Sequence, residues 1–291
     1  MFKKVIIYGH KLHSHTHSYI HQAFYKAFLK MGYETLWLDK NDKFENYDFS
    51  NSLFLTEGQV IDNIPVRSDC KYLLHFVDKD TVKKIGLDES NVLNFKFFEN
   101  ESTKYEKIND FSFYDRKSNI LYFPWAATLF PDQIDKCSEK LFNPKERDVN
   151  FIGSVWDVNV EYIKKFKESC TVSNKNFHWR RLLNDKEYFY YTVKSYATVD
   201  FRGELHLNIG YLPCRIFKAL SYGIVPGTNS EHVKKAFGEY VYFNENPGQI
   251  LEGTAEFWKS KDKKDIRAAM NFVKENHTYI NRINDIFEVL K

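Results

Sequence analysis

The sequence predicts an α/β fold with two domains, each a mostly parallel sheet covered by helices. Its 291 residues are enough for two ordinary domains with sizeable cores. A strand–helix–strand pattern opens the chain, and a second one begins near residue 148 after a polar stretch. Such units are typical of parallel sheets that are buried on both faces.

The first unit follows from apolar periodicity. Residues 5–9 are a continuous apolar run, residues 18–31 have apolar side chains at helical spacing, and residues 34–39 form a second run after Gly32. Further strands of an open parallel sheet are expected at residues 53–56, 71–77, 92–98 and 119–123. We therefore expect residues 1–130 to form an N-terminal domain.

The domain boundary is predicted at residues 131–148, which are polar, carry two prolines and lack a long apolar run. Residues 148–155 then restart the pattern as strand, glycine turn and helix, so residues 149–275 are expected to form the second domain. Its later elements are expected at residues 222–225, 240–243, 249–259 and 264–290.

The segment from Tyr211 to Thr228 combines an amphipathic helix, a glycine stop at Gly223 and a short buried strand that starts at Ile224 and is closed by Pro-Gly. Arg215 falls in the first turn of that helix. A cation there opposes the helix dipole, so it is poorly placed unless an anion binds beside it. The alternative is an ordinary surface arginine.

Gly153 ends the apolar strand that opens the second domain and allows close approach of a ligand to the backbone. Together with Ser154 and Arg215 it makes a plausible diphosphate site at the carboxyl ends of parallel strands. Arg180 and Arg181 follow an aromatic residue, which suits either phosphate contacts or a solvated helix face.

Five of the ten histidines lie between His10 and His21. One of them is a candidate general base, because the loop opens on the ligand side of the sheet. The alternation His13, His15, His17 instead suits zinc and resembles the His-x-His motif of PHP-type metal-dependent hydrolases, although no second His-x-His follows. Otherwise several of them cap or hydrate the helix start.

Bulk composition restricts the partners. Forty-two basic and thirty-nine acidic side chains leave a net charge of +3, from which we expect neither nucleic acid nor a membrane surface as a partner. The four cysteines form no C-x-x-C pair, and the apolar run at residues 5–8 is too short for a signal peptide or membrane span. A cytoplasmic protein is expected.

Asp78-x-Asp80 matches a metal-binding pattern of some sugar transferases, but the charged start of a surface helix is the favoured interpretation.

Three stretches resemble, in order, the carboxyl half of CgeB-like glycosyltransferases of the GT-B type, over residues 148–291. They are DVNFIGS, RIFKALSYGIVPGT and ENHTYINR. The amino half is more weakly similar to exostosin-type transferases. The resemblance implies two Rossmann-like domains facing across a cleft. It also implies a nucleotide-diphosphate sugar donor (UDP- or GDP-sugar) on the second domain, a carbohydrate or glycoconjugate acceptor on the first, and no required metal or cofactor.

Carried over by position, the resemblance places Gly153 and Ser154 against the donor diphosphate and Arg215 on the phosphates or ribose. Lys218 stands where many relatives have glutamate, so it either contacts phosphate or leaves the ribose to other residues. Residues 276–291 would form a final helix that packs back on the first domain.

In enzymes of this arrangement that invert the anomeric centre, a histidine just before the first helix removes the proton of the acceptor hydroxyl. His17 is the residue expected in that role, with His15 as second choice. The sequence thus predicts a hexosyl or pentosyl transferase. The alternatives are a metal-dependent hydrolase using His13, His15 and His17, and a non-catalytic nucleotide-sugar-binding protein.

Overall fold

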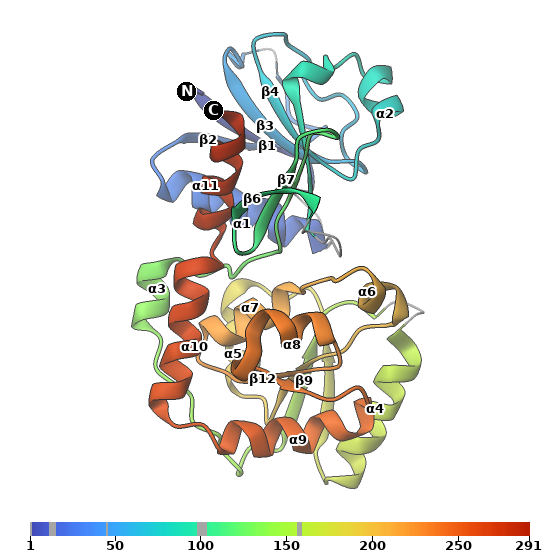
Figure 1. Cartoon of the computed structure of the whole chain (residues 1–291), viewed down its shortest axis with the longest axis vertical. Coiled ribbons are helices and arrows are strands. Elements are labelled where there is room, and N and C mark those ends of the chain that lie inside the picture. The colour runs from blue at the N-terminus through green and yellow to red at the C-terminus, as the bar shows by residue number, and fades with distance from the viewer. Residues whose placement is uncertain (1, 12–15, 45, 98–103, 156–158) are drawn as a thin grey trace. The chain divides into compact units, whose positions relative to one another are not determined.

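The computed structural model describes residues 2–11, 16–44, 46–97, 104–155 and 159–291, and the chain forms two compact units (Figure 1). The first unit takes the described residues of Met1–Phe97, Glu101–Pro124 and Tyr279–Lys291, and the second takes those of Trp125–Thr278. The amino-terminal part of the first unit thus ends at Pro124, and the stretch 131–148, expected as a linker, lies within the second unit.

The first unit is built on one sheet with the strand order β2-β1-β3-β4-β5-β8-β7-β6 among the described residues. Its strands are β1 (Lys4–Tyr8), β2 (Glu34–Leu38), β3 (Ser52–Glu57), β4 (Lys71–His75), β5 (Val92–Lys96), β6 (Glu106–Asn109), β7 (Ser112–Asp115) and β8 (Ile120–Tyr122). Its helices are α1 (Thr16–Lys30), α2 (Lys79–Lys84) and α11 (Tyr279–Leu290), with a 3₁₀ turn at Glu89–Asn91.

Six neighbouring strands pair in parallel, as the sequence predicts: β2, β1, β3, β4, β5 and β8. Strands β7 and β6 add an antiparallel edge beyond β8 that the sequence did not predict. The sheet is therefore mostly parallel, as expected, with an antiparallel edge that the sequence did not locate. The reason is that β6 (EKIN) is polar and half-exposed, so it lacks the apolar run by which a buried strand is recognised.

The direction of the chain through the sheet reverses between β1 and β3. From β1 the chain passes through α1 to β2 on one side, whereas β3, β4 and β5 extend the sheet on the other side. β1 and β3 are hydrogen-bonded neighbours, with Ile7 opposite Leu55. Open α/β sheets bind ligands outside the carboxyl ends of the strands at such a switch point.

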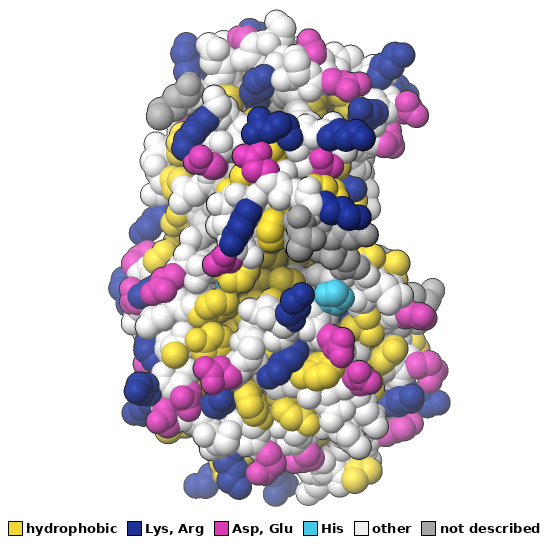
Figure 2. All heavy atoms as spheres, viewed as in Figure 1, with side chains coloured by type: hydrophobic (Ala, Val, Ile, Leu, Met, Phe, Trp, Pro, Cys, Tyr) yellow, Lys and Arg dark blue, Asp and Glu magenta, His cyan; other side chains and the backbone are white. Residues whose placement is uncertain are grey.

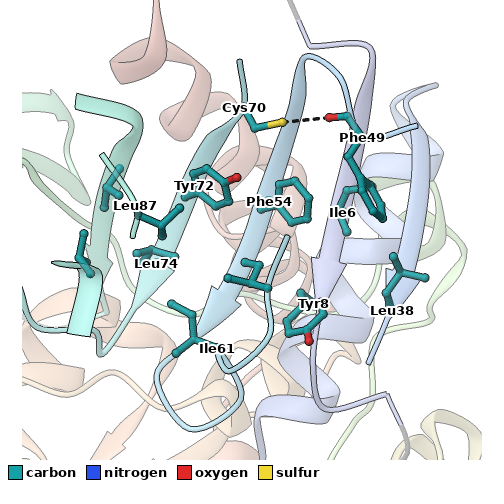
Figure 3. Close-up of a cluster of buried hydrophobic side chains, with 13 residues drawn as sticks. Ile6, Tyr8, Leu38, Phe49, Phe54, Ile61, Cys70, Tyr72, Leu74 and Leu87 are labelled. Atoms are coloured by element: carbon teal, nitrogen blue, oxygen red, sulfur yellow. Dashed lines mark hydrogen bonds between the residues drawn. The ribbon is translucent and has the colours of Figure 1, made fainter. Parts of the chain in front are cut away.

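Aromatic side chains fill both faces of this sheet. On one face Phe54 and Tyr72 stack with ring centroids 5.2 Å apart in a cluster that also includes Val82 of α2 (Figure 3). On the other face, Phe24 of α1 contacts Tyr279 of α11, with centroids 4.9 Å apart. Much of the high aromatic content therefore serves the core.

The second unit contains parallel strands in two groups, β10-β9 and β11-β12-β13. The strands are β9 (Asp148–Ile152), β10 (Asn176–Arg180), β11 (Thr198–Asp200), β12 (Pro226–Thr228) and β13 (Tyr242–Phe243). The helices are α3 (Pro131–Lys136), α4 (Val160–Val172), α5 (Asp185–Val193), α6 (Glu204–Asn208), α7 (Cys214–Ser221), α8 (Glu231–Phe237), α9 (Pro247–Lys259) and α10 (Lys263–Asn276), with a 3₁₀ turn at Gly238–Tyr240.

Two sequence predictions for this unit need correction. The strand expected from Ile224 begins at Pro226, because Ile224 and Val225 lead out of the left-handed Gly223 before β12 pairs with β11. The segment around His178 is strand β10 rather than a helix face. Residues 264–290 form two helices, of which α11 corresponds to the final helix expected at residues 276–291, and the His277 carbonyl accepts the Ala127 N–H at 2.8 Å where the chain leaves α10.

Helix α11 belongs to the first unit, where its polar side chains are bonded inside the protein. The Asp285 carboxylate accepts hydrogen bonds from Ser112 Oγ and Asn109 Nδ2, both at 2.6 Å. Arg282 Nε donates to the Pro124 carbonyl at 2.7 Å. Among the described residues, no helix combines the length and the apolar character needed to span a bilayer.

Candidate functional site

Four histidines and one glutamate meet at the carboxyl edge of the first sheet. His10 follows β1, Glu57 ends β3 and His75 ends β4, while His17 and His21 lie on the first turns of α1. The ring centroid of His17 lies 5.5 Å from that of His10 and 5.4 Å from that of His75. We call these five residues the histidine cluster, and it lies at the switch point between β1 and β3.

Glu57 is the centre of the cluster, and its side chain is only 1% exposed. Its Oε2 accepts the Gln59 N–H at 2.9 Å, while its Oε1 is hydrogen-bonded to His10 Nε2 and lies 3.7 Å from His17 Nδ1. Burial alone would raise the pKa of Glu57, but the hydrogen bonds from His10 and Gln59 and the nearby His17 lower it to about 2. The carboxylate is therefore ionised at neutral pH.

His21 and His75 are neutral members of the cluster. Burial lowers the pKa of each to about 3, although each ring pairs with a backbone carbonyl, Gly9 at 2.9 Å and Phe95 at 3.1 Å. Within the described part of the cluster, this leaves His10, His17 or a bound cation to balance the charge of Glu57.

The backbone around the cluster is held in an uncommon conformation. Gly9, His10 and Phe76 all have positive φ, of 87°, 60° and 54°. A side chain at Gly9 would collide with Val60, and Trp37 Nε1 fixes the Gly9 carbonyl at 2.9 Å. Non-glycine residues in this region persist only where the surroundings impose it, and they concentrate at functional sites.

The structure places His17, the first choice for a base, in this cluster with its side chain 12% exposed. His13 and His15 lie outside the described residues. Sequence reasoning missed Glu57 and the pairing of His10 with it. The available signal was position, because Glu57 closes an apolar strand immediately before a glycine.

The second candidate site is built around Arg215, in the first turn of α7 as predicted. Its Nε and Nη2 donate to the Ile152 carbonyl at 2.9 and 2.6 Å, and its Nη1 donates to Asp200 Oδ1 at 2.7 Å. Gly153 has φ 142°, and a Cβ there would collide with the Arg215 guanidinium. This close approach is the reason a glycine is needed at the end of β9.

Asp200 is shared by two arginines. Arg202 Nε and Nη2 donate to its two oxygens at 2.9 and 2.7 Å, and the Asp200 side chain is fully buried. Two guanidiniums on one carboxylate leave a net positive charge. We call Arg202 and Arg215 the arginine pair. Burial lowers the pKa of Arg215, and Asp200 opposes that shift. A buried excess of positive charge at the ends of β9 and β11 suits an anion.

Lys218 adds a third cation near this pair. It is 6% exposed, and its Nζ lies 4.2 Å from the centre of the Tyr188 ring. Burial raises the pKa of Tyr188 to about 12, and the nearby positive charge of Arg215 opposes this rise. Arg215 and Lys218 are thus linked through one aromatic residue.

The other residues predicted to bind the nucleotide-sugar donor make contacts within the protein. The Gly153 N–H donates to the Arg180 carbonyl at 3.0 Å, so the strand pairing already uses it. The Arg180 guanidinium stacks 3.6 Å from the centre of the Tyr191 ring and donates to Asn150 Oδ1. Ser154 is half-buried next to Gly153.

Asp78 caps α2 by accepting the Thr81 N–H at 2.7 Å, which confirms the helix-start interpretation of Asp78-x-Asp80.

The described part of the chain also holds a group of possible metal ligands. One nitrogen each from His10 and His17 and one oxygen of Glu57 lie within 4.8 Å of one another. This differs from the zinc set proposed from the sequence, since it shares only His17 with it.

No protein-family model matches the sequence, and no curated protein matches it either. Solved structures do match over 100% of both chains. An alpha-glucosyltransferase in complex with UDP aligns with TM-score 0.63 at 10% identity. Complexes of an alpha-glucosyltransferase with UDP and a 13-mer DNA align with TM-score 0.64 at 11% identity (DNA with an A:G mismatch) and 0.59 at 10% identity (DNA with an HMU base). The likeness confirms the predicted α/β fold of GT-B type.

The expectation that nucleic acid is excluded as a partner is wrong, because two of these three similar structures hold DNA. That expectation depended on a net charge of only +3. Net charge does not describe where charges lie, and Figure 2 shows basic and acidic side chains interspersed over the face it presents.

Proposed function

We propose that this chain is a glycosyltransferase that moves a sugar from a nucleotide-diphosphate sugar to a hydroxyl acceptor. The observation that carries the proposal is the arginine pair, in which Arg202 and Arg215 share the buried Asp200 at the carboxyl ends of β9 and β11. The GT-B type fold and the UDP in similar structures support a UDP-sugar as donor, with a GDP-sugar as the alternative.

The chemistry requires fixed positive charge at the leaving diphosphate. Donors that are already oriented where charge develops stabilise the transition state without reorganising. Arg202 and Arg215 are held by hydrogen bonds to Asp200, and Lys218 lies over the ring of Tyr188, which is close enough to Arg215 to feel its charge. We propose that these three cations serve the diphosphate and that no metal ion is needed there. Ser154 provides the adjoining backbone, and Gly153, whose N–H already bonds the Arg180 carbonyl, contributes the space left by its missing side chain.

The histidine cluster supplies the base in this proposal. His17 is the most accessible of the two histidines that face Glu57, with 12% of its side chain exposed against 4% for His10. A proton taken from the acceptor hydroxyl by His17 would be stabilised by the Glu57 carboxylate, as in other base–carboxylate pairs. His15 remains a second choice that lies outside the described residues.

The acceptor is proposed to be a hydroxyl of a carbohydrate or glycoconjugate. A hydroxyl on DNA is a second candidate acceptor, because two similar structures contain a DNA 13-mer together with UDP. Radiolabelled sugar transfer to glycan, glycolipid and modified-DNA acceptors distinguishes these acceptors directly.

The donor site is tested by calorimetric titration of UDP into wild type and Arg215→Lys, with EDTA present. The variant keeps the charge but loses the two-pronged hydrogen bonding, so we expect binding weaker by about 1.5–3 kcal/mol. Arg267→Lys is a matched control, because Arg267 also bonds one carboxylate (Glu139) and a backbone carbonyl (Cys137) in the same unit. Equal affinity of wild type and Arg215→Lys for UDP would refute the assignment.

A further inference from the structure

We propose that His10, His17 and Glu57 bind one divalent transition-metal ion of the zinc type, and that the bound ion blocks the base. The first part depends only on the geometry of the cluster. The second part rests on the function proposed above, in which His17 accepts a proton.

The three ligand atoms are already close to a coordinating arrangement. Ligand atoms around a four-coordinate zinc ion lie about 3.3 Å apart, given bond lengths of about 2.0–2.2 Å. His17 Nδ1 and Glu57 Oε1 are 3.7 Å apart, and His10 Nε2 contacts the same oxygen. All three atoms lie within 4.8 Å of one another. A metal ion that replaces the proton between His10 Nε2 and Glu57 Oε1 would thus require only small side-chain movements.

The ligand types select the ion. Two imidazoles and one carboxylate suit zinc and its transition-metal neighbours, whereas Mg²⁺ and Ca²⁺ favour all-oxygen sites. Glu57 is buried and carries a full negative charge, so a dication improves the charge balance of the cluster. Three protein ligands would leave a fourth position open, as in catalytic rather than structural zinc sites.

The surroundings hold the ligands in place. The Gln59 N–H orients the Glu57 carboxylate through its second oxygen at 2.9 Å. The Gly9 carbonyl, next to His10, is fixed by both His21 Nδ1 and Trp37 Nε1 at 2.9 Å. Partners of this kind orient ligands and raise the affinity of metal sites. The positive φ of His10 also helps to orient a ligand, because it fixes the direction in which the His10 side chain leaves the backbone.

The binding test uses the full chain, zinc chloride and a chromophoric chelator in competition. We expect one zinc ion per chain in wild type, no competition from magnesium chloride, and affinity at least roughly 10–100-fold lower in Glu57→Gln and in His17→Gln. If one variant fails to fold, the other still tests the site, and thermal melting shows whether each variant is folded.

Two controls define the site. His178→Gln removes another histidine–carboxylate pair, His178 Nε2 to Asp148 Oδ1 at 3.1 Å, which is exposed and belongs to no group of three possible metal ligands in the part of the chain that the structure describes. The double variant His13→Ala/His15→Ala removes the zinc ligands that the sequence suggested. Both should bind zinc like wild type. Zinc affinity that is unchanged in Glu57→Gln and His17→Gln, or that is lost with His13 and His15, overturns the proposal.

The activity test separates the two parts. One equivalent of zinc should inhibit sugar transfer, and EDTA should restore it. Zinc that binds through Glu57 and His17 but leaves transfer unaffected overturns the blocking role alone. If no donor and acceptor support transfer, the function proposed above fails, and the binding test still decides the metal site. Hydrolysis that depends on added zinc would instead favour the metal-dependent hydrolase and overturn the blocking role.

Discussion

The two candidate sites are built on the same plan with different chemistry. Each lies at the carboxyl ends of parallel strands and centres on one buried carboxylate shared by two basic side chains. In the first unit Glu57 is shared by His10 and His17, whereas in the second unit Asp200 is shared by Arg202 and Arg215. Imidazoles exchange a proton near neutral pH, but guanidiniums keep their charge.

This difference assigns the roles that we propose. A site with permanent net positive charge suits an anionic ligand and is poorly suited to accept a proton. A site whose bases can gain a proton or a metal ion suits acid–base chemistry. The comparison is sharpened by variants that affect one site and leave the other intact.

The largest expected effect is on catalysis by His17→Ala. Loss of a general base lowers the rate constant for transfer by about 10²–10⁴-fold. UDP affinity should stay at the wild-type value, because His17 belongs to the first unit and the arginine pair to the second. Steady-state transfer assays with calorimetry of UDP binding measure both quantities. A variant that loses UDP binding in step with activity would contradict the separation of roles.

A smaller effect is expected on stability from Gly153→Ala. The added Cβ meets the Arg215 guanidinium, and φ 142° is strained for any other residue. We expect the free energy of unfolding to fall by about 1–3 kcal/mol, together with weaker UDP binding because Arg215 must move. Gly32→Ala is the control, since Gly32 also has positive φ (87°) but a Cβ there meets nothing within 4 Å. Unchanged UDP affinity in Gly153→Ala would argue against the contact of Arg215 with the donor.

Lys218→Met tests the third cation. The variant keeps the length of the side chain and removes the charge above Tyr188, so UDP binding should weaken by about 1.5 kcal/mol, the low end for a bond to a charged group. Lys175→Met is the control, because Lys175 Nζ also lies over a tyrosine ring, 3.4 Å from the centre of Tyr196. Equal calorimetric affinities of wild type and Lys218→Met would remove Lys218 from the donor site.

The smallest effect is expected from chelation. If the cations of the second unit replace a metal at the diphosphate, transfer activity in EDTA should not fall below its value in buffer alone. Activity that disappears in EDTA and returns with Mg²⁺ or Mn²⁺ would favour a metal-dependent transfer reaction.

The sequence was sufficient for the features that depend on local patterns. Apolar runs located β1 to β5, and the glycine at residue 223 and the periodicity before it located α7 and placed Arg215 in its first turn. It was insufficient for β6 and β7, which are short strands at the sheet edge, the first of them polar.

The candidate sites were predicted only in part, for a physical reason. Arg215 and His17 stand out by their position at helix starts, but their carboxylate partners, Asp200 and Glu57, are distant in sequence. Which strand ends meet is decided by sheet order, and sheet order is a long-range property. The same holds for Arg202, which precedes α6 in a segment that spacing alone could not rank.

The most direct test of the central claim compares UDP with uridine as calorimetric ligands of the wild-type chain in EDTA. If the arginine pair binds the diphosphate, UDP should bind at least roughly tenfold more tightly than uridine, which corresponds to about 1.4 kcal/mol, and the difference should shrink in Arg215→Lys. Equal affinities for UDP and uridine, or a difference that Arg215→Lys leaves intact, would contradict the account.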